Sequence, residues 1–188
     1  LGSDKGLHPA VNRAVSTLSQ HKMINSASYL ANGDHYISNT DTLPKCAIGV
    51  HLNILRGRPL SDPSSVASLV NNSGYFTGRY DILFARYCLG IIRLDDVERE
   101  WRAQIEKILT QNITVSHLDS EKHVHCWPQL FKLTDKLAQE YKIPRIRHTW
   151  EPAMNATPFK NRLRIGLLNV WKRLSINSTT PSMAMTWG

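Results

Sequence analysis

The chain has 188 residues and a formal net charge of +8, with 41% hydrophobic and 20% charged residues, as in an ordinary globular protein. This length suits one domain with a substantial core, so we expect a single domain over residues 1–188. The sequence contains no apolar run of about 18 residues, which excludes an integral membrane protein.

The first third of the chain predicts one helix, two strands and a long loop. Residues 9–21 begin with a proline and carry apolar residues at helical spacing, which predicts a helix. Residues 26–31 have the composition of a short strand, and residues 46–54 predict a strand that is buried on both faces. Residues 56–78 are rich in Gly, Pro, Ser and Asn and therefore predict a long loop that covers a site.

The remaining residues predict helices that alternate with strands. Residues 95–111 have apolar positions three and four apart and acids in the first turn, so they predict an amphipathic helix. Residues 114–118 predict a strand, and a second amphipathic helix follows Pro128. Residues 145–148 predict a further strand, and residues 159–174 predict a basic amphipathic helix.

Strands that alternate with helices predict an α/β protein with parallel strands. Ligands gather at the carboxyl ends of the strands in such folds. Asp4, His51 and the polar run at residues 117–125 all fall at or just after predicted strand ends, so we expect them to converge. Their Asp, His and Glu side chains are ligands that zinc and similar divalent ions accept, which favours a hydrolytic metal site. A solvated polar turn is the alternative.

Several longer motifs follow one another along the chain. They are DKGLHPAVNRAV from Asp4, the Asn32-Gly33 pair, GVHLNILRGRPLS from Gly49, EREWRAQIEKIL from Glu98 and HLDSEKHVHCWPQLF from His117. Together they resemble the YdjC/ChbG-like carbohydrate deacetylases, and residues 159–174 resemble the basic helix of hopanoid-cluster (HpnK-type) members.

The resemblance implies a distorted (β/α) barrel that hydrolyses the acetamido group of an N-acetylated sugar with a divalent metal ion, Mg or Zn. Carried over by position, the metal ligands are Asp4, His51 and Glu121. Glu121 stands where the family run has a histidine, and a carboxylate oxygen can also ligate a divalent ion.

The chain departs from the family pattern at three further places. Ser3 stands where the family turn has an acid that is expected to act as a base, and serine is a poor general base. The strand before that turn is expected to be missing, and so is the last part of the barrel. The expected fold is therefore an incomplete, distorted (β/α) barrel with parallel strands.

Three further residues are candidates for contact with the substrate. His123 and His125 are candidates for proton transfer or oxyanion contact, because histidine titrates near neutral pH. Their alternative role is to orient the loop or cap the next helix. Trp127 is a candidate for stacking on a sugar face, with packing in the core as the alternative.

The charge distribution and the cysteines bear on partners and location. The residues from Lys142 onward include eight bases and one acid, Glu151, which fits a solvated helix face or a contact surface. No recognition helix, RNP-like strand or zinc finger occurs, so we expect no nucleic acid. The three cysteines lack close spacing and residues 1–6 lack the features of a secretory leader, which predicts a cytoplasmic protein.

Two functions from different classes follow. The first is a metal-dependent carbohydrate deacetylase that acts on an N-acetylated sugar or glycan. The alternative is a catalytically inactive deacetylase-like scaffold that serves as a binding or assembly subunit, and for either one a homo-oligomer or an assembly partner is considered. The metal distinguishes the two, because the enzyme must hold one and the scaffold need not.

Overall fold

The fold is built on one parallel sheet, seen in a computed structural model that describes residues 4–6, 8–36, 46–149 and 182–185. Six strands in these ranges lie side by side in the order in which the chain forms them, and every neighbouring pair is parallel. They are β1 (Asp4–Lys5), β2 (Ser26–Tyr29), β3 (Ala47–Leu52), β4 (Val115–Ser120), β5 (Ile146–Thr149) and β6 (Ser182–Met185).

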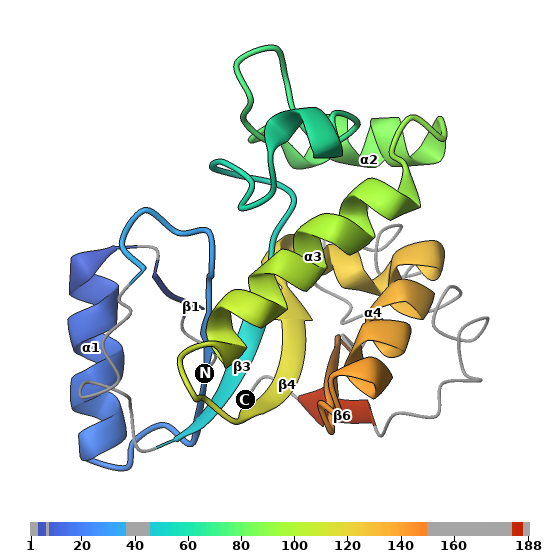
Figure 1. Cartoon of the computed structure of the whole chain (residues 1–188). Helices are drawn as coiled ribbons and strands as arrows, with labels where there is room; N and C mark the ends of the chain where they lie inside the picture. The colour runs from blue at the N-terminus through green and yellow to red at the C-terminus, as the bar shows by residue number, and fades with distance from the viewer. Residues whose placement is uncertain (1–3, 7, 37–45, 150–181, 186–188) are drawn as a thin grey trace, which may run out of the picture.

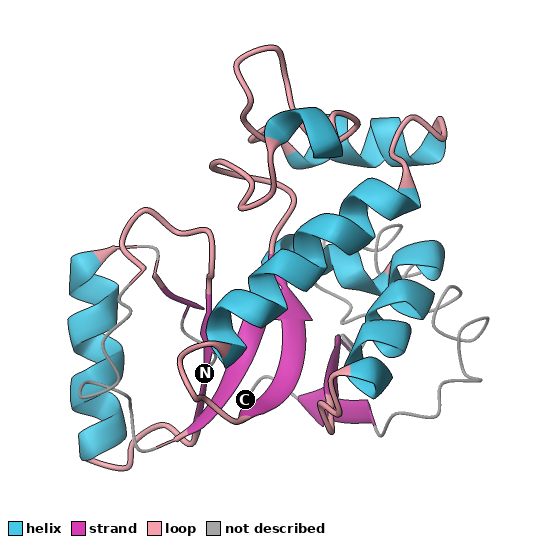
Figure 2. Cartoon of the chain, viewed as in Figure 1, coloured by secondary structure: helices cyan, strands magenta, loops and turns pink. Residues whose placement is uncertain are grey.

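The connections between the strands carry helices, as Figure 2 shows. The α-helices are α1 (Pro9–Gln20), α2 (Tyr80–Cys88), α3 (Leu94–Leu109) and α4 (Pro128–Glu140). In Figure 1, α3 crosses β3 and β4, α4 lies beside it, and α1 stands at the β1 side of the sheet. When parallel strands follow one another in chain order, right-handed crossovers place the connecting helices on the same face of the sheet, as in (β/α) barrels. The predicted α/β class with parallel strands is therefore confirmed.

Local sequence explains where these helices begin and which face they bury. Pro9 and Pro128 stand at the first positions of α1 and α4, where a missing N–H costs nothing. The first turn of α3 holds Asp95 and Asp96, whose charges suit the positive end of the helix dipole. The apolar face of α3 packs into the main core with β3, β4 and α4; its fully buried members are Val97, Trp101, Ile105 and Ile108.

The structure corrects the sequence prediction in three places. Asp4, expected in a turn with no strand before the first helix, lies in the two-residue strand β1, which pairs with β2. Helix α2 was not predicted, because the loop signals end at Gly78 and α2 is only weakly amphipathic. Strand β6 was not predicted either. The predicted helix at residues 159–174 and most of the basic last quarter lie outside the described residues.

No helix in the described ranges combines the length and the apolar character needed to cross a bilayer.

Candidate active site

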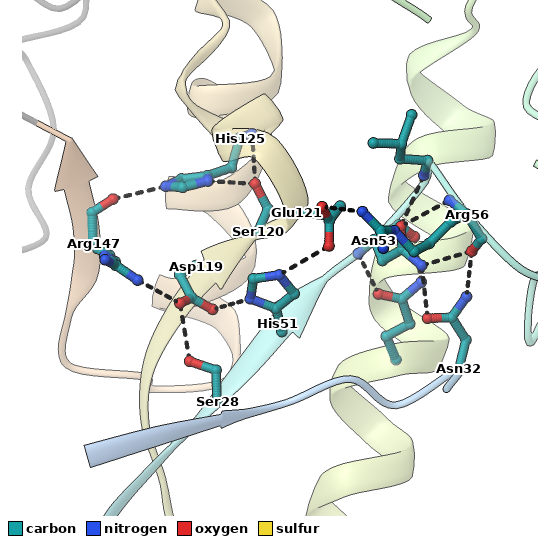
Figure 3. A network of polar contacts seen from close by, with 12 residues as sticks. Ser28, Asn32, His51, Asn53, Arg56, Asp119, Ser120, Glu121, His125 and Arg147 are labelled. Atoms are coloured by element: carbon teal, nitrogen blue, oxygen red, sulfur yellow. Dashed lines mark hydrogen bonds and ion pairs between the residues drawn. The ribbon is translucent and has the colours of Figure 1, made fainter. Parts of the chain in front are cut away.

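The carboxyl ends of β3 and β4 bring a histidine and an aspartate together. His51 and Asp119 are register partners, and His51 Nδ1 lies 2.9 Å from Asp119 Oδ1. Both side chains are buried. Because an ionised carboxylate can only accept a hydrogen bond, Nδ1 carries the hydrogen, and the lone pair of a neutral His51 ring is then on Nε2. Figure 3 shows the ring between Asp119 and Glu121.

Asp119 is the most heavily bonded carboxylate of the site. Its Oδ2 accepts hydrogen bonds from Ser28 Oγ at 2.9 Å and from Arg147 Nη1 at 3.3 Å. Burial alone would raise the pKa of Asp119, but the bonds and charges of its neighbours, His51 first among them, hold that pKa far below its usual range. Asp119 is therefore ionised at neutral pH and fixes the orientation of the His51 ring.

Glu121 follows β4 and faces the other nitrogen of the same ring. Its Oε2 lies 3.7 Å from His51 Nε2, while its Oε1 accepts a hydrogen bond from Arg56 Nη2 at 2.7 Å. Burial raises the pKa of Glu121, but the nearby His51 ring and the charge of Arg56 outweigh it, so the pKa lies below its usual value. Glu121 thus supplies an ionised oxygen beside His51 Nε2.

The described contacts of His51 and Glu121 fit a divalent metal ion. Two ligands bound at about 2.1 Å in tetrahedral geometry lie about 3.4 Å apart, close to the Nε2–Oε2 separation. Metal-bound histidines characteristically donate their other N–H to a carboxylate, as His51 does to Asp119. Among the described residues no group of three His, Cys, Asp or Glu side chains forms a metal site. The third predicted ligand, Asp4, is described in its backbone only.

The backbone of Asp4 lies in the sheet that carries these residues. Asp4 is the register partner of Ser28 in β2, and Ser28 is in turn the partner of Gly49 in β3. Two positions after Gly49 comes His51. The three predicted metal-ligand positions therefore lie on strands of one sheet or, for Glu121, directly after a strand, as the rule for parallel strands anticipates.

His125 is buried, and both its ring nitrogens have partners within the protein. Nδ1 lies 2.6 Å from Ser120 Oγ, and Nε2 donates to the carbonyl oxygen of Arg147 at 2.7 Å. Burial lowers the pKa of His125, but the charge and bond of Cys126 and the Arg147 carbonyl raise it overall. These contacts join the end of β4 to β5, which fits the alternative role of orienting the loop.

His123 is held in an unusual backbone conformation. His123 and Lys122 have φ angles of 56° and 51°, in the left-handed region that residues other than glycine seldom adopt. Burial, with His125 and Arg147 nearby, lowers the pKa of His123 to about 3, so the ring is neutral at neutral pH. Its Nδ1 is buried and has no hydrogen-bond partner among the described residues. Such strain is typical of functional sites, and His123 remains a candidate for proton transfer.

Trp127 does not lie at an open surface. It is 1% exposed, and its rings pack against Tyr80, Phe84 and Tyr87 of α2. The structure therefore corrects the prediction that Trp127 stacks on a sugar and supports the packing alternative.

A buried polar network holds the loop that follows β3. The backbone N–H of Asn53 donates to Gln104 Oε1 at 2.8 Å, and Gln104 Nε2 donates to the carbonyl of Asn53 at 2.7 Å. Glu100 accepts the backbone N–H groups of Leu60 at 3.0 Å and Ser61 at 2.9 Å. The side chains of Asn53, Glu100 and Gln104 are fully buried. Sequence reasoning did not identify them, although polar residues at buried-face positions of an amphipathic helix were a usable signal.

The fold and the site define the class of protein: an α/β protein with one parallel sheet and a His–carboxylate cluster at the carboxyl ends of its strands. The chain matches the family described as YdjC-like protein over residues 2–186, and it belongs to that family.

Two relatives with similar sequences share one description, carbohydrate deacetylase. A carbohydrate deacetylase of Oceanobacillus iheyensis is 33% identical over 144 residues, which make up 75% of this chain and 60% of that protein. A carbohydrate deacetylase of Geobacillus stearothermophilus is also 33% identical over 144 residues, 75% of this chain and 55% of that protein. The chain thus spans little more than half the length of these curated relatives.

A solved structure shares the fold. It comes from Enterococcus faecalis V583 and is provisionally described as a cellobiose-phosphate cleavage protein. The two structures superpose with a TM-score of 0.71 at 25% identity, and the match covers 96% of this chain and 64% of the other.

Proposed function

We propose that the chain carries the active site of a metal-dependent deacetylase that removes the acetyl group from an N-acetylated sugar. One observation carries the proposal: Asp119 fixes the His51 ring so that Nε2 faces an ionised oxygen of Glu121. The description of the two bacterial relatives as carbohydrate deacetylases agrees with it.

The metal would be held by His51, Glu121 and Asp4. When bound, a divalent ion supplies Lewis-acid polarisation of the acetyl carbonyl and lowers the pKa of water. In the hydrolysis, the water oxygen bonds to the acyl carbon, the C–N bond breaks and the amine nitrogen takes a proton. Acetate and a free amino sugar leave.

The residues of the chain have separate tasks in this proposal. Asp119 keeps the hydrogen of His51 on Nδ1. Arg147 neutralises the second oxygen of Asp119, so the buried carboxylate is compensated on both sides. His123, whose Nδ1 has no hydrogen-bond partner among the described residues, is the candidate to pass a proton from the attacking water to the leaving amine.

The alternative is an inactive scaffold, and Ser3 favours it, because serine replaces the acid that the family resemblance expects to act as a base. Elemental analysis of chelator-free protein separates the two functions. We expect one metal per chain in the wild type, loss of that metal in an Asp4→Ala/His51→Ala variant, and acetate release from N-acetylated mono- and disaccharides.

The matched control is His21→Ala, which removes an exposed histidine far from β3 in sequence and should keep the metal. A wild-type chain that takes up no added zinc, magnesium or manganese would exclude the catalytic function and leave the scaffold.

A further inference from the structure

The two oxygens of Glu121 have different neighbours. Oε1 lies 2.7 Å from Arg56 Nη2, and Oε2 lies 3.7 Å from His51 Nε2. Arg56 comes from the loop after β3 and Glu121 from the segment after β4, so the contact joins two neighbouring loops above the sheet. As Figure 3 shows, the guanidinium approaches the carboxylate from the side away from Asp119.

The backbone of Arg56 is held on both its polar groups. Its N–H donates to Asn53 Oδ1 at 3.2 Å, and its carbonyl accepts Asn53 Nδ2 at 2.8 Å and Asn32 Nδ2 at 3.3 Å. Asn53 is fully buried and is itself tied to Gln104. The guanidinium therefore extends from a fixed point, which distinguishes Arg56 from an ordinary surface arginine.

We propose that Arg56 is a positioning residue for the metal ligand Glu121, an inference that rests on the proposed function. By binding Oε1, it leaves Oε2 as the oxygen that faces His51 Nε2. Carboxylates that ligate metals are themselves hydrogen-bonded, and loss of such a partner weakens metal affinity by about 10-fold to 100-fold.

The positive charge of Arg56 also repels a cation, so the two effects must be weighed. The side chain of Arg56 is 42% exposed, and water screens much of its charge. The short bond to Oε1 is specific and lies on a carboxylate that is only 11% exposed. Orientation of the ligand therefore outweighs repulsion of the ion.

The test is a calorimetric titration, in which zinc ion alone is added to the full chain after treatment with a chelator. We expect Arg56→Ala to bind zinc about 10-fold to 100-fold more weakly than the wild type, and Arg56→Lys to recover part of the loss. Arg58→Ala is the matched control. Arg58 lies in the same loop but places its guanidinium 4.8 Å from the centre of the exposed Tyr75 ring, and its loss should leave the affinity unchanged.

A double-mutant cycle separates positioning from a general effect on the loop. In a Glu121→Ala background, adding Arg56→Ala should change zinc affinity no further, because Arg56 acts through Glu121. If the single variant Arg56→Ala binds zinc as tightly as the wild type or more tightly, this inference is overturned but the proposed function is not. A wild-type chain that binds no zinc, magnesium or manganese overturns the proposed function and this inference together.

Discussion

Gly49 shows how one missing side chain shapes the site. It is the register partner of His117, and a Cβ built on Gly49 would lie 2.3 Å from His117 Nε2. The His117 ring is buried, and its Nε2 lies 3.2 Å from Ser28 Oγ, which also bonds Asp119. Burial lowers the pKa of His117, so the ring packs in its neutral form.

We therefore expect Gly49→Ala to displace His117 and to lower the free energy of unfolding by about 1–3 kcal/mol, the usual cost of overpacking. Urea unfolding measures this change. Gly90→Ala is an informative comparison, since a Cβ there meets nothing within 4 Å and only its φ of 69° opposes the substitution. If Gly49→Ala unfolds at the same urea concentration as the wild type, the predicted clash between the added Cβ and the His117 ring is contradicted.

Asp119 gives a second prediction at the scale of single residues. Asp119→Asn keeps the size of the side chain but removes the charge that fixes His51. We expect zinc affinity to fall by about 10-fold to 100-fold, as for other partners of metal-bound histidines. Calorimetry measures it, with the exposed Asp34→Asn as the control. Unchanged affinity would mean that His51 keeps its orientation without this carboxylate.

At the scale of the element, one face of α3 both packs in the core and binds the loop after β3. Val97, Trp101 and Ile105 fill the core, and Glu100 and Gln104 on the same side bind the loop after β3. Hydrophobic periodicity was sufficient to predict the helix. It could not predict the polar contacts, because their partners are backbone groups of a loop whose path depends on the rest of the fold.

Glu100 tests this second task of α3. Glu100→Ala removes the acceptor of the Leu60 and Ser61 amides and of Gln104 Nε2. Leaving such donors unsatisfied should lower the free energy of unfolding by about 1–3 kcal/mol and speed hydrogen exchange at those two amides. Glu106→Ala, on the exposed face of the same helix, should leave both amides protected. Unchanged exchange in Glu100→Ala would show that the loop is held by other contacts.

At the scale of the whole molecule, the sequence predicted the arrangement of strands and helices better than it predicted the contacts between side chains. The parallel sheet and the meeting of His51 with the segment at residues 117–125 follow from alternation of elements and from the rule for strand ends. The Arg56–Glu121 pair did not follow, because the position of the Arg56 side chain depends on the path of the loop after β3. The packing partners of Trp127 did not follow either, since they belong to α2, an element that was not predicted.

The site also spans the molecule, because Arg147, Asp119, His51 and Glu121 link β5, β4 and β3 in one chain of contacts. A metal bound at its end would stabilise all three strands. With zinc at about 100 times its dissociation constant, mass action adds about 2.7 kcal/mol to the free energy of unfolding. For a chain of this size we expect the melting temperature to rise by about 5–10 °C. His51→Ala should show no such rise in calorimetric scans, and an equal rise in that variant would mean that zinc binds elsewhere.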